Sequence, residues 1–182
     1  MSRLLTFAVL VAALVFAGCG DKHDYNLAAE TEGEYVDVGN LVYQVQMSRF
    51  LNPGDREDRE YLEGLPAGTP SPTADETWFG VWMRVKNYTN ETLQMAEDFV
   101  VIDTQENRFE PIPLDNPFAY EAIPLGADQV YPLPDTAASS GPIQGALILF
   151  KLTNDSLQNR PLKLEIEQEG AVNPKAEIDL DL

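Results

Sequence analysis

The residue types that most often perform covalent or metal chemistry are scarce in this sequence. It contains one cysteine, Cys19, and one histidine, His23. A Ser–His–Asp triad needs a histidine beside its nucleophile, and a zinc site needs several Cys or His ligands. His23 lies in a polar stretch, where we expect a solvated residue, and no glycine-rich phosphate-binding loop occurs. Catalysis by a pair of carboxylates is the type of enzyme chemistry that these counts do not exclude. No spacing of acidic residues identifies such a pair, so we predict that the protein is not an enzyme.

Cys19 follows a segment typical of an exported protein. Arg3 precedes residues 4–17, an apolar run shorter than the roughly 20 residues of a membrane-spanning helix. The run Phe16-Ala17-Gly18-Cys19 resembles the bacterial lipobox, in which lipid is attached to the cysteine before cleavage, although that pattern prefers Leu where Phe16 stands. The alternative is an ordinary signal peptide with an unrelated cysteine. Since a lone cysteine can form no intramolecular disulfide, lipid attachment gives Cys19 its simplest role.

These features predict a domain organisation and a location. Residues 1–18 are expected to be a signal peptide, residues 19–33 the lipidated cysteine and a flexible tether, and residues 34–182 a β-sandwich domain. The polar tether lacks periodicity and would reach at most roughly 50 Å when extended. The lipid attached to a lipobox cysteine is a diacylglyceryl group, and its two acyl chains would hold the protein stably on a membrane. We therefore expect a bacterial membrane protein, lipid-anchored on the extracytoplasmic face, whose membrane contact is the lipid on Cys19.

Acidic residues provide the one metal hypothesis. Glu97, Asp98, Asp103 and Glu106 flank a predicted short strand and the turn after it. Carboxylate oxygens suit a hard cation such as calcium, but no EF-hand loop occurs. The alternative is a solvated acidic edge. We predict no metal site and no cofactor, and these four residues are the candidates for a metal site if one exists.

Aromatic residues provide a second hypothesis. Five of them could form a binding patch or could lie in the core and at its edge. The sequence favours the core. These residues are Trp78, Trp82, Tyr88, Phe118 and Tyr120.

The charge of the chain limits its partners. It has 12 Lys and Arg against 30 Asp and Glu, a formal net charge of -18. Such a chain is repelled by nucleic acid and by anionic headgroups, so nucleic-acid binding is not expected. This acidity is typical of a surface that keeps a protein soluble. Alternatively, it indicates that the protein binds a cationic partner or a divalent metal.

Period-two alternation of apolar residues predicts short strands as the elements of the domain. Residues 36–38 and 41–47 alternate on either side of Gly39-Asn40, a plausible hairpin turn. In residues 78–86, Phe79, Val81, Met83 and Val85 share one face, and Trp82, Arg84 and Lys86 share the other. Further strands are expected at 99–102, 108–110, 143–152, 162–167 and 177–182.

Other segments of the chain are irregular. Residues 143–152 are apolar at nearly every position, which is typical of a central strand covered on both sides. Only residues 55–65 suggest a helix, and residues 52–77 and 111–128 are long proline-rich loops. The pattern predicts an all-β, antiparallel, immunoglobulin-like β-sandwich with long Pro-rich loops.

Several short motifs resemble a family of small secreted or lipid-anchored bacterial domains of unknown function. The family is common in actinobacteria and Firmicutes, has an immunoglobulin-like β-sandwich and is similar to a secreted mycobacterial antigen. The resemblance covers roughly residues 33–168 and implies no catalytic residues, and the insertion at 52–77 is less typical of it. The motifs are Val38-Gly39-Asn40-Leu41, Val85-Lys86-Asn87, Asn90-Glu91-Thr92-Leu93, Asp98-Phe99, Asp103 to Phe109, and the strand around Leu147 to Phe150.

The sequence therefore predicts a non-catalytic lipoprotein of the cell envelope. We expect a binding or accessory interaction module displayed on the membrane surface, with an envelope protein or a glycan as its partner. One alternative is a calcium- or glycan-binding surface protein that uses the acidic turn or the aromatic loop. The other is a carboxylate-dependent hydrolase of envelope polymers.

Overall fold

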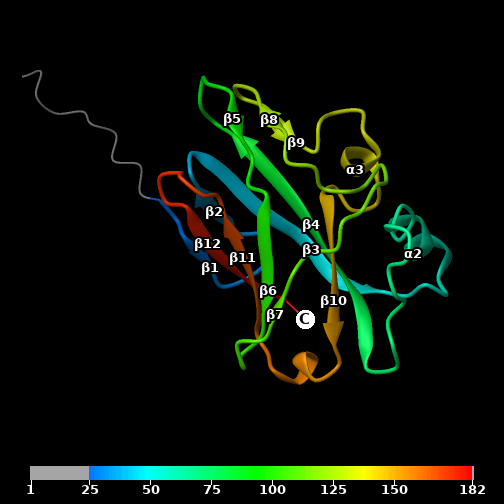
Figure 1. Cartoon of the computed structure of the whole chain (residues 1–182). Helices are drawn as coiled ribbons and strands as arrows, with labels where there is room; N and C mark the ends of the chain where they lie inside the picture. Colours follow the sequence, from blue (N-terminus) through cyan, green and yellow to red (C-terminus); the bar gives the residue numbers. More distant parts are fainter. Residues whose placement is uncertain (1–24, 182) are drawn as a thin grey trace, which may run out of the picture.

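The computed structural model of the chain describes residues 25–181. Two sheets pack face to face, and a short ribbon and three short helical segments complete the fold (Figure 1). The first sheet contains, in spatial order, β10 (Ala146–Thr153), β4 (Glu76–Asn87), β3 (Leu41–Leu51) and β2 (Tyr35–Val38), with β9 (Val130–Tyr131) also paired to β4. The second contains β1 (Ala28–Ala29), β12 (Lys175–Leu180), β11 (Leu162–Glu167), β6 (Asp98–Ile102) and β7 (Arg108–Phe109). The ribbon pairs β5 (Leu93–Gln94) with β8 (Pro124–Leu125), and the helical segments are α2 (Arg56–Tyr61), α3 (Ala137–Ser140) and η1 (Ser156–Gln158).

The predicted all-β sandwich is confirmed. Every strand pair is antiparallel except β1 with β12, which is parallel. The predicted hairpin at Gly39-Asn40 joins β2 to β3, with Val38 opposite Leu41. Gly39 adopts φ +61°, a conformation that glycine reaches without steric cost, which explains its place in this turn.

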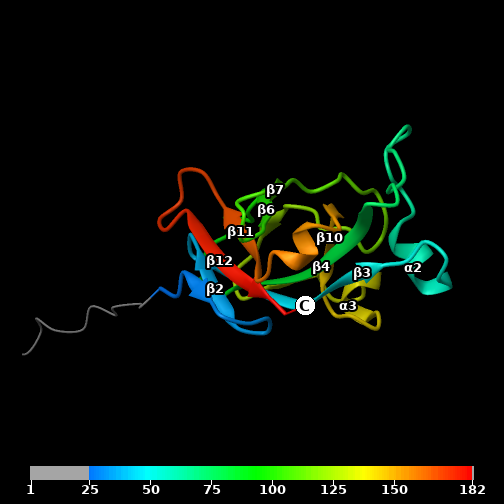
Figure 2. The ribbon, with the colours of Figure 1, turned by 90° about the horizontal axis from the view of Figure 1, so that it is seen from below.

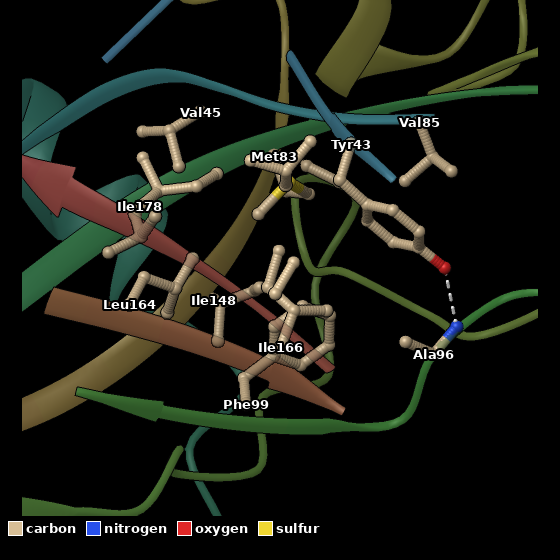
Figure 3. Close-up of a cluster of buried hydrophobic side chains, with 14 of the residues drawn as sticks. Tyr43, Val45, Met83, Val85, Ala96, Phe99, Ile148, Leu164, Ile166 and Ile178 are labelled. Atoms are coloured by element: carbon tan, nitrogen blue, oxygen red, sulfur yellow. Dashed lines mark hydrogen bonds between the residues drawn. The ribbon is translucent and has the colours of Figure 1, made fainter. Parts of the chain in front are cut away.

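The main core lies between the two sheets (Figure 3). Tyr43, Val45, Met83 and Val85 project from β3 and β4 toward the second sheet, as the alternation predicts. The Tyr43 hydroxyl accepts a hydrogen bond from the backbone N–H of Ala96 at 2.8 Å. Burial raises the pKa of Tyr43 far above its ordinary value, so the phenol stays neutral. Side chains of the second sheet and of β10 complete this core: Phe99, Ile148, Leu164, Ile166 and Ile178.

A second core covers part of the opposite side of the first sheet. Trp78 and Trp82 project outward from β4, and both are almost completely buried. They lie beneath α2 and residues 111–120, so packing fixes a part of each predicted long loop. Gly80 lies between the two tryptophans in sequence, and a Cβ there would lie only 2.8–2.9 Å from Leu147 and Trp82. The packing of Trp82 over β4 therefore requires glycine at position 80.

An arginine closes the edge of this second core. The Arg49 guanidinium lies 5.2 Å from the Trp82 ring centroid and 5.9 Å from that of Tyr61. Its Nη2 atom is 2.6 Å from Asp58 Oδ1, which also fixes α2. Burial opposes ionisation of Asp58, but hydrogen bonds from Arg49 and the Asn52 backbone outweigh it and lower the pKa of Asp58 overall. The helix, at residues 56–61, is shorter than the predicted 55–65.

The prediction of a central strand at residues 143–152 is partly wrong. β10 is covered on both faces, as its apolar sequence indicates, but it lies at the edge of its sheet. Backbone groups of the proline-rich loop bond to this edge: Ile112 donates to Leu149 at 2.7 Å, and Tyr120 donates to Leu147 at 2.8 Å. An apolar run indicates that both faces of a strand are buried, but it does not indicate what pairs with its edges. Here a loop, and not a further strand, bonds to the free edge of β10.

The structure also corrects the predicted tether at 19–33. Residues 25–33 are attached to the sandwich, where β1 pairs with β12 and Asn26 exchanges hydrogen bonds with Asp37. Glu32 accepts hydrogen bonds from the backbone and hydroxyl of Ser48 and from the Asp181 backbone. Burial raises the pKa of Glu32 despite these bonds. β12 and Asp181 lie at the far end of the chain, so local sequence could not reveal that they hold this segment.

Candidate functional site

The outer side of the first sheet is divided into a covered half and an open half. The second core covers the half formed by Trp78, Gly80 and Trp82. Among residues 25–181 no loop of this kind covers the other half, toward β2, and the outward side chains there include exposed Tyr35 and Arg84. A register shift in β3 between Val45 and Met47 separates the two halves. The open half is the candidate functional site.

Strand register places the side chains of this half in two rows. Tyr35 lies opposite Gln44, and Gln44 lies opposite Arg84, which gives one row across β2, β3 and β4. The next row contains Asp37, Val42 and Lys86 in the same order. Residues in register share a face, and alternate residues along a strand return to it. We define the tyrosine–basic face as Tyr25, Tyr35, Val42, Gln44, Arg84, Lys86 and Tyr88.

Three tyrosines of this face are exposed. Relative exposure is 38% for Tyr25, 51% for Tyr35 and 58% for Tyr88. Tyr25 donates a hydrogen bond from its hydroxyl to Asn40 Oδ1 at 3.2 Å. Exposed aromatic rings that gather in one place are typical of binding surfaces.

Two cations accompany the tyrosines. Lys86 Nζ lies 3.9 Å from the Tyr88 ring centroid, a cation–π contact. Arg84 is exposed, and within residues 25–181 no ion pair engages Arg84 or Lys86. The face therefore presents positive charge on a chain whose net charge is -18.

Two open hollows lie on this face and share Val42 and Tyr88. The larger has a volume of about 490 Å³, and the smaller has a volume of about 80 Å³. The shared residues make the two hollows one continuous surface. The larger is lined by Tyr25, Asp37, Asn40, Val42, Tyr88 and Thr89, and the smaller by Tyr35, Val42, Gln44, Arg84, Lys86 and Tyr88.

A buried asparagine positions Tyr88. The Asn87 side chain donates from Nδ2 toward the carbonyls of Glu91 at 2.7 Å and of Leu125 and Gly126 at 3.0 Å. Its Oδ1 accepts from the Thr89 backbone at 2.9 Å. Asn87 is fully buried, so these bonds satisfy a polar group that would otherwise be costly. The sequence indicated a turn here, but it did not reveal that the asparagine fixes the turn to β8.

The structure does not bring the four acidic candidates together. Glu97 and Asp98 lie at the start of β6, and Asp103 follows its end, roughly 17 Å away along the strand. Glu106 is exposed in the turn, with φ 64°. Within residues 25–181 no three His, Cys, Asp or Glu side chains are grouped so that they could hold a metal ion.

Asp103 holds a turn together. Its Oδ1 accepts from the backbone N–H groups of Gln105 and Asn107, and its Oδ2 accepts from the side chains of Asn107 and Asn159. Burial favours the protonated form, but these bonds and one from Ser156 outweigh it and lower the pKa of Asp103 to about 2. The carboxylate is already occupied by N–H donors, so its geometry is that of a turn and not of a metal ligand.

The predicted aromatic patch does not form as one surface. Trp78 and Trp82 belong to the second core, and Phe118 packs against it. Tyr120 packs against the main core and donates to the Ala96 carbonyl at 2.9 Å. Only Tyr88 of that set is exposed. Tyr25 and Tyr35 were missed, although the alternation that buries Val36 and Val38 places Tyr35 on the outer face.

The remaining predicted site residue, Cys19, and the lone histidine, His23, lie outside the described residues. The lipid attachment stays a prediction. In the part of the chain that the structure describes, no helix is both long and apolar enough to cross a membrane.

Comparisons with known proteins support the fold. No family model matches the chain, and no curated protein sequence matches it. The yjhA protein from Bacillus subtilis is similar in structure, with a TM-score of 0.56 at 10% sequence identity, over 84% of this chain and 99% of that one. An uncharacterised β-sandwich protein from Clostridium difficile 630 has a TM-score of 0.43 at 9% identity, over 90% of this chain and 100% of that one. At such low identity, the likeness to the B. subtilis protein shows a shared fold alone.

Proposed function

We propose that this chain is a non-catalytic binding module of the bacterial cell envelope, anchored by lipid on Cys19, and that it binds its partner through the tyrosine–basic face. The observation that carries the proposal is the grouping of three exposed tyrosines around Arg84 and Lys86. The proposed anchor rests on the lipobox-like sequence before Cys19.

Physical reasoning favours a role in binding for this face. Exposed tyrosine contributes a large rigid ring at low conformational cost and a hydroxyl for hydrogen bonding. Tyrosine and arginine are also the residue types that most often dominate interface energies. The inner sides of the same strands are fixed in the main core, so the face is presented on a rigid scaffold.

Affinity capture tests the binding role. The full-length wild-type chain and a Tyr35→Ala, Arg84→Gln double variant are each used to capture components of detergent-solubilised envelope. We expect the wild type to recover a component in stoichiometric amount and the double variant to lose it. An Arg56→Gln, Arg59→Gln variant on α2, which lies at the opposite end of the first sheet from β2 in both views (Figures 1 and 2), is the control. Equal recovery by all three proteins, or none above background, would refute the role of this face.

The anchor has a separate test. A Cys19→Ala variant should lose incorporation of labelled fatty acid and leave the membrane fraction, because the thiol that accepts the lipid is absent. A Cys19→Ala chain that remains labelled and membrane-bound contradicts lipid attachment at this residue. Neither outcome bears on the tyrosine–basic face, so the two parts of the proposal are tested independently.

A further inference from the structure

We infer that the ligand of the tyrosine–basic face is an acidic oligosaccharide in which acidic and neutral sugars alternate. Its rings would lie against Tyr35 and Tyr88, and its carboxylates against Arg84 and Lys86. This inference rests on the proposed function, and it names the class of ligand.

The cations of the face select an anionic ligand. Five other basic side chains of the described residues form ion pairs with acids, whereas Arg84 and Lys86 form none within residues 25–181. Arg56 and Arg59 on α2 also form no ion pair within residues 25–181, but they alternate with Glu57, Asp58 and Glu60, whereas Arg84 and Lys86 are neighbours on one strand face with no acid between them on that face of β4. The arginine fork matches a carboxylate in bidentate geometry, and lysine adds a point charge. The paired basic residues are Arg49, Arg108, Lys151, Lys163 and Lys175.

The tyrosines and amides select a sugar. The faces of aromatic rings pack against apolar C–H surface, and the phenol hydroxyl provides a hydrogen bond at the ring edge. Gln44 and Asn40 line the hollows, and amide side chains offer both donors and acceptors to hydroxyl groups. A ligand with apolar C–H faces, many hydroxyls and a carboxylate satisfies all three kinds of group.

The net charge limits the charge density of the ligand. A chain with a formal charge of -18 repels nucleic acid and other densely charged polyanions at long range. Within residues 25–181, the local attraction on this face comes from Arg84 and Lys86, whose Cα atoms are roughly 7 Å apart along β4. A glycan with a carboxylate on every second sugar offers an anion to each of these cations. It adds little repulsion from the acidic protein, because its charge density is low.

The shape of the face favours a ligand that lies flat along it. Tyr35 and Arg84 occupy the ends of one row, two strand spacings or about 10 Å apart. Both hollows are open to solvent and continuous through Val42 and Tyr88. Asp37 lies at the far side from Lys86, and its carboxylate accepts from the Asn26 backbone at 2.7 Å.

Calorimetric titration of the full-length chain in detergent micelles tests the inference. The probe is a short hyaluronan oligosaccharide, in which glucuronate alternates with N-acetylglucosamine. A chitin oligosaccharide of equal length is the neutral control, and inorganic phosphate and anionic phospholipid micelles are further arms. We expect the acidic sugar to bind and the other three to bind at least tenfold more weakly. Equal binding of the chitin oligosaccharide, or stronger binding of phosphate or phospholipid, would overturn the inference.

Matched variants locate the binding. Arg84→Gln should weaken hyaluronan binding by roughly tenfold or more, because a charge-assisted bidentate contact is lost. Arg59→Gln makes the same charge change on α2 and should leave the affinity unchanged. Tyr35→Ala should weaken binding, whereas Tyr35→Phe should retain most of it. If Arg59→Gln weakens binding as much as Arg84→Gln, long-range charge and not the face explains it, and the inference fails.

The failure of this inference is distinguishable from the failure of the proposed function. If no acidic oligosaccharide binds but envelope capture still depends on Tyr35 and Arg84, the face binds another class of partner and only the sugar assignment is wrong. If capture is also independent of these residues, the proposed function is wrong as well.

Discussion

Protonation of Asp103 should cost the protein a defined part of its stability. The pKa of this carboxyl falls from an ordinary 3.8 to about 2 in the folded state. Each pKa unit corresponds to ~1.4 kcal/mol, so the folded environment favours the ionised form by about 2.5 kcal/mol at neutral pH. Because the folded pKa is the lower one, this stability is fully present above about pH 5 and is lost as the pH falls toward 2.

Urea denaturation of the wild type and of Asp103→Asn measures this term. Asparagine cannot ionise, and its amide group would face the amide donors of Asn107 and Asn159. The wild type should therefore be more stable at pH 7, and the difference should shrink by roughly 1.6 kcal/mol on going to pH 2.5. Other acids titrate alike in both proteins and cancel in the difference.

A second variant tests the cause of the shift. Asn107→Ala removes the side-chain donor 2.8 Å from Asp103 Oδ2 and keeps the backbone donor. Its pH-dependent loss should begin at the same pH, because the unfolded pKa sets the onset, but it should be complete at a higher pH and be smaller than that of the wild type. If wild type and Asp103→Asn lose stability in parallel between pH 5 and pH 2.5, the hydrogen bonds do not hold this carboxyl ionised and the reasoning is refuted.

Three further predictions concern residues that support the sheet. Gly80→Ala should lower the free energy of unfolding by about 1–3 kcal/mol in urea titrations, because its Cβ would meet side chains 2.8–2.9 Å away. Asn87→Ala should lower the free energy of unfolding by about 1–3 kcal/mol, because the buried hydrogen bonds of the Asn87 side chain are lost. It should also speed amide hydrogen exchange in the turn after β4. Arg49→Met leaves the Asp58 carboxylate buried without its partner and should cost roughly 3 kcal/mol at pH 7. Because the folded pKa of Asp58 is depressed, the wild type should lose this advantage over Arg49→Met as the pH falls below about 4.

Local pattern predicted the strands because alternation is a local property. Val36 and Val38, like Phe79 to Val85, point inward at every second residue, and each set lies in the main core. The pattern also grouped Trp82 with Arg84 and Lys86, and all three do project from the same side of β4. What it could not predict is that Trp82 is buried and Arg84 exposed. That difference is made by loops from elsewhere in the chain, which cover one half of the sheet.

The site was harder to predict than the fold for the same reason. The tyrosine–basic face combines Tyr35 of β2 with Tyr88 after β4, which the pairing of β2, β3 and β4 brings together, and Tyr25 is added by its hydrogen bond to Asn40. The four acidic candidates are close in sequence, but Glu97 and Asp98 lie at one end of β6, whereas Asp103 and Glu106 lie in the turn at its other end. Proximity in sequence was therefore a poor guide to the candidate site in this chain.

The fixed N-terminal segment leads to a last prediction about orientation. Tyr25 belongs to the sandwich, so a lipid on Cys19 would be joined to it by a chain that spans at most about 20 Å, against roughly 50 Å for the tether first expected. Tyr25 belongs to the tyrosine–basic face, and α2 lies at the opposite end of the first sheet from β2 in both views (Figures 1 and 2). With Cys19 blocked by lipid, single cysteines can be labelled elsewhere. In proteoliposomes that contain an acceptor lipid, a donor dye at Asn40→Cys should transfer energy more efficiently than one at Arg59→Cys. Insertion of a long Gly-Ser linker before Tyr25 should reduce the difference, because the domain could then rotate freely. Equal transfer from both positions without the linker would show that the anchor does not hold this face near the membrane.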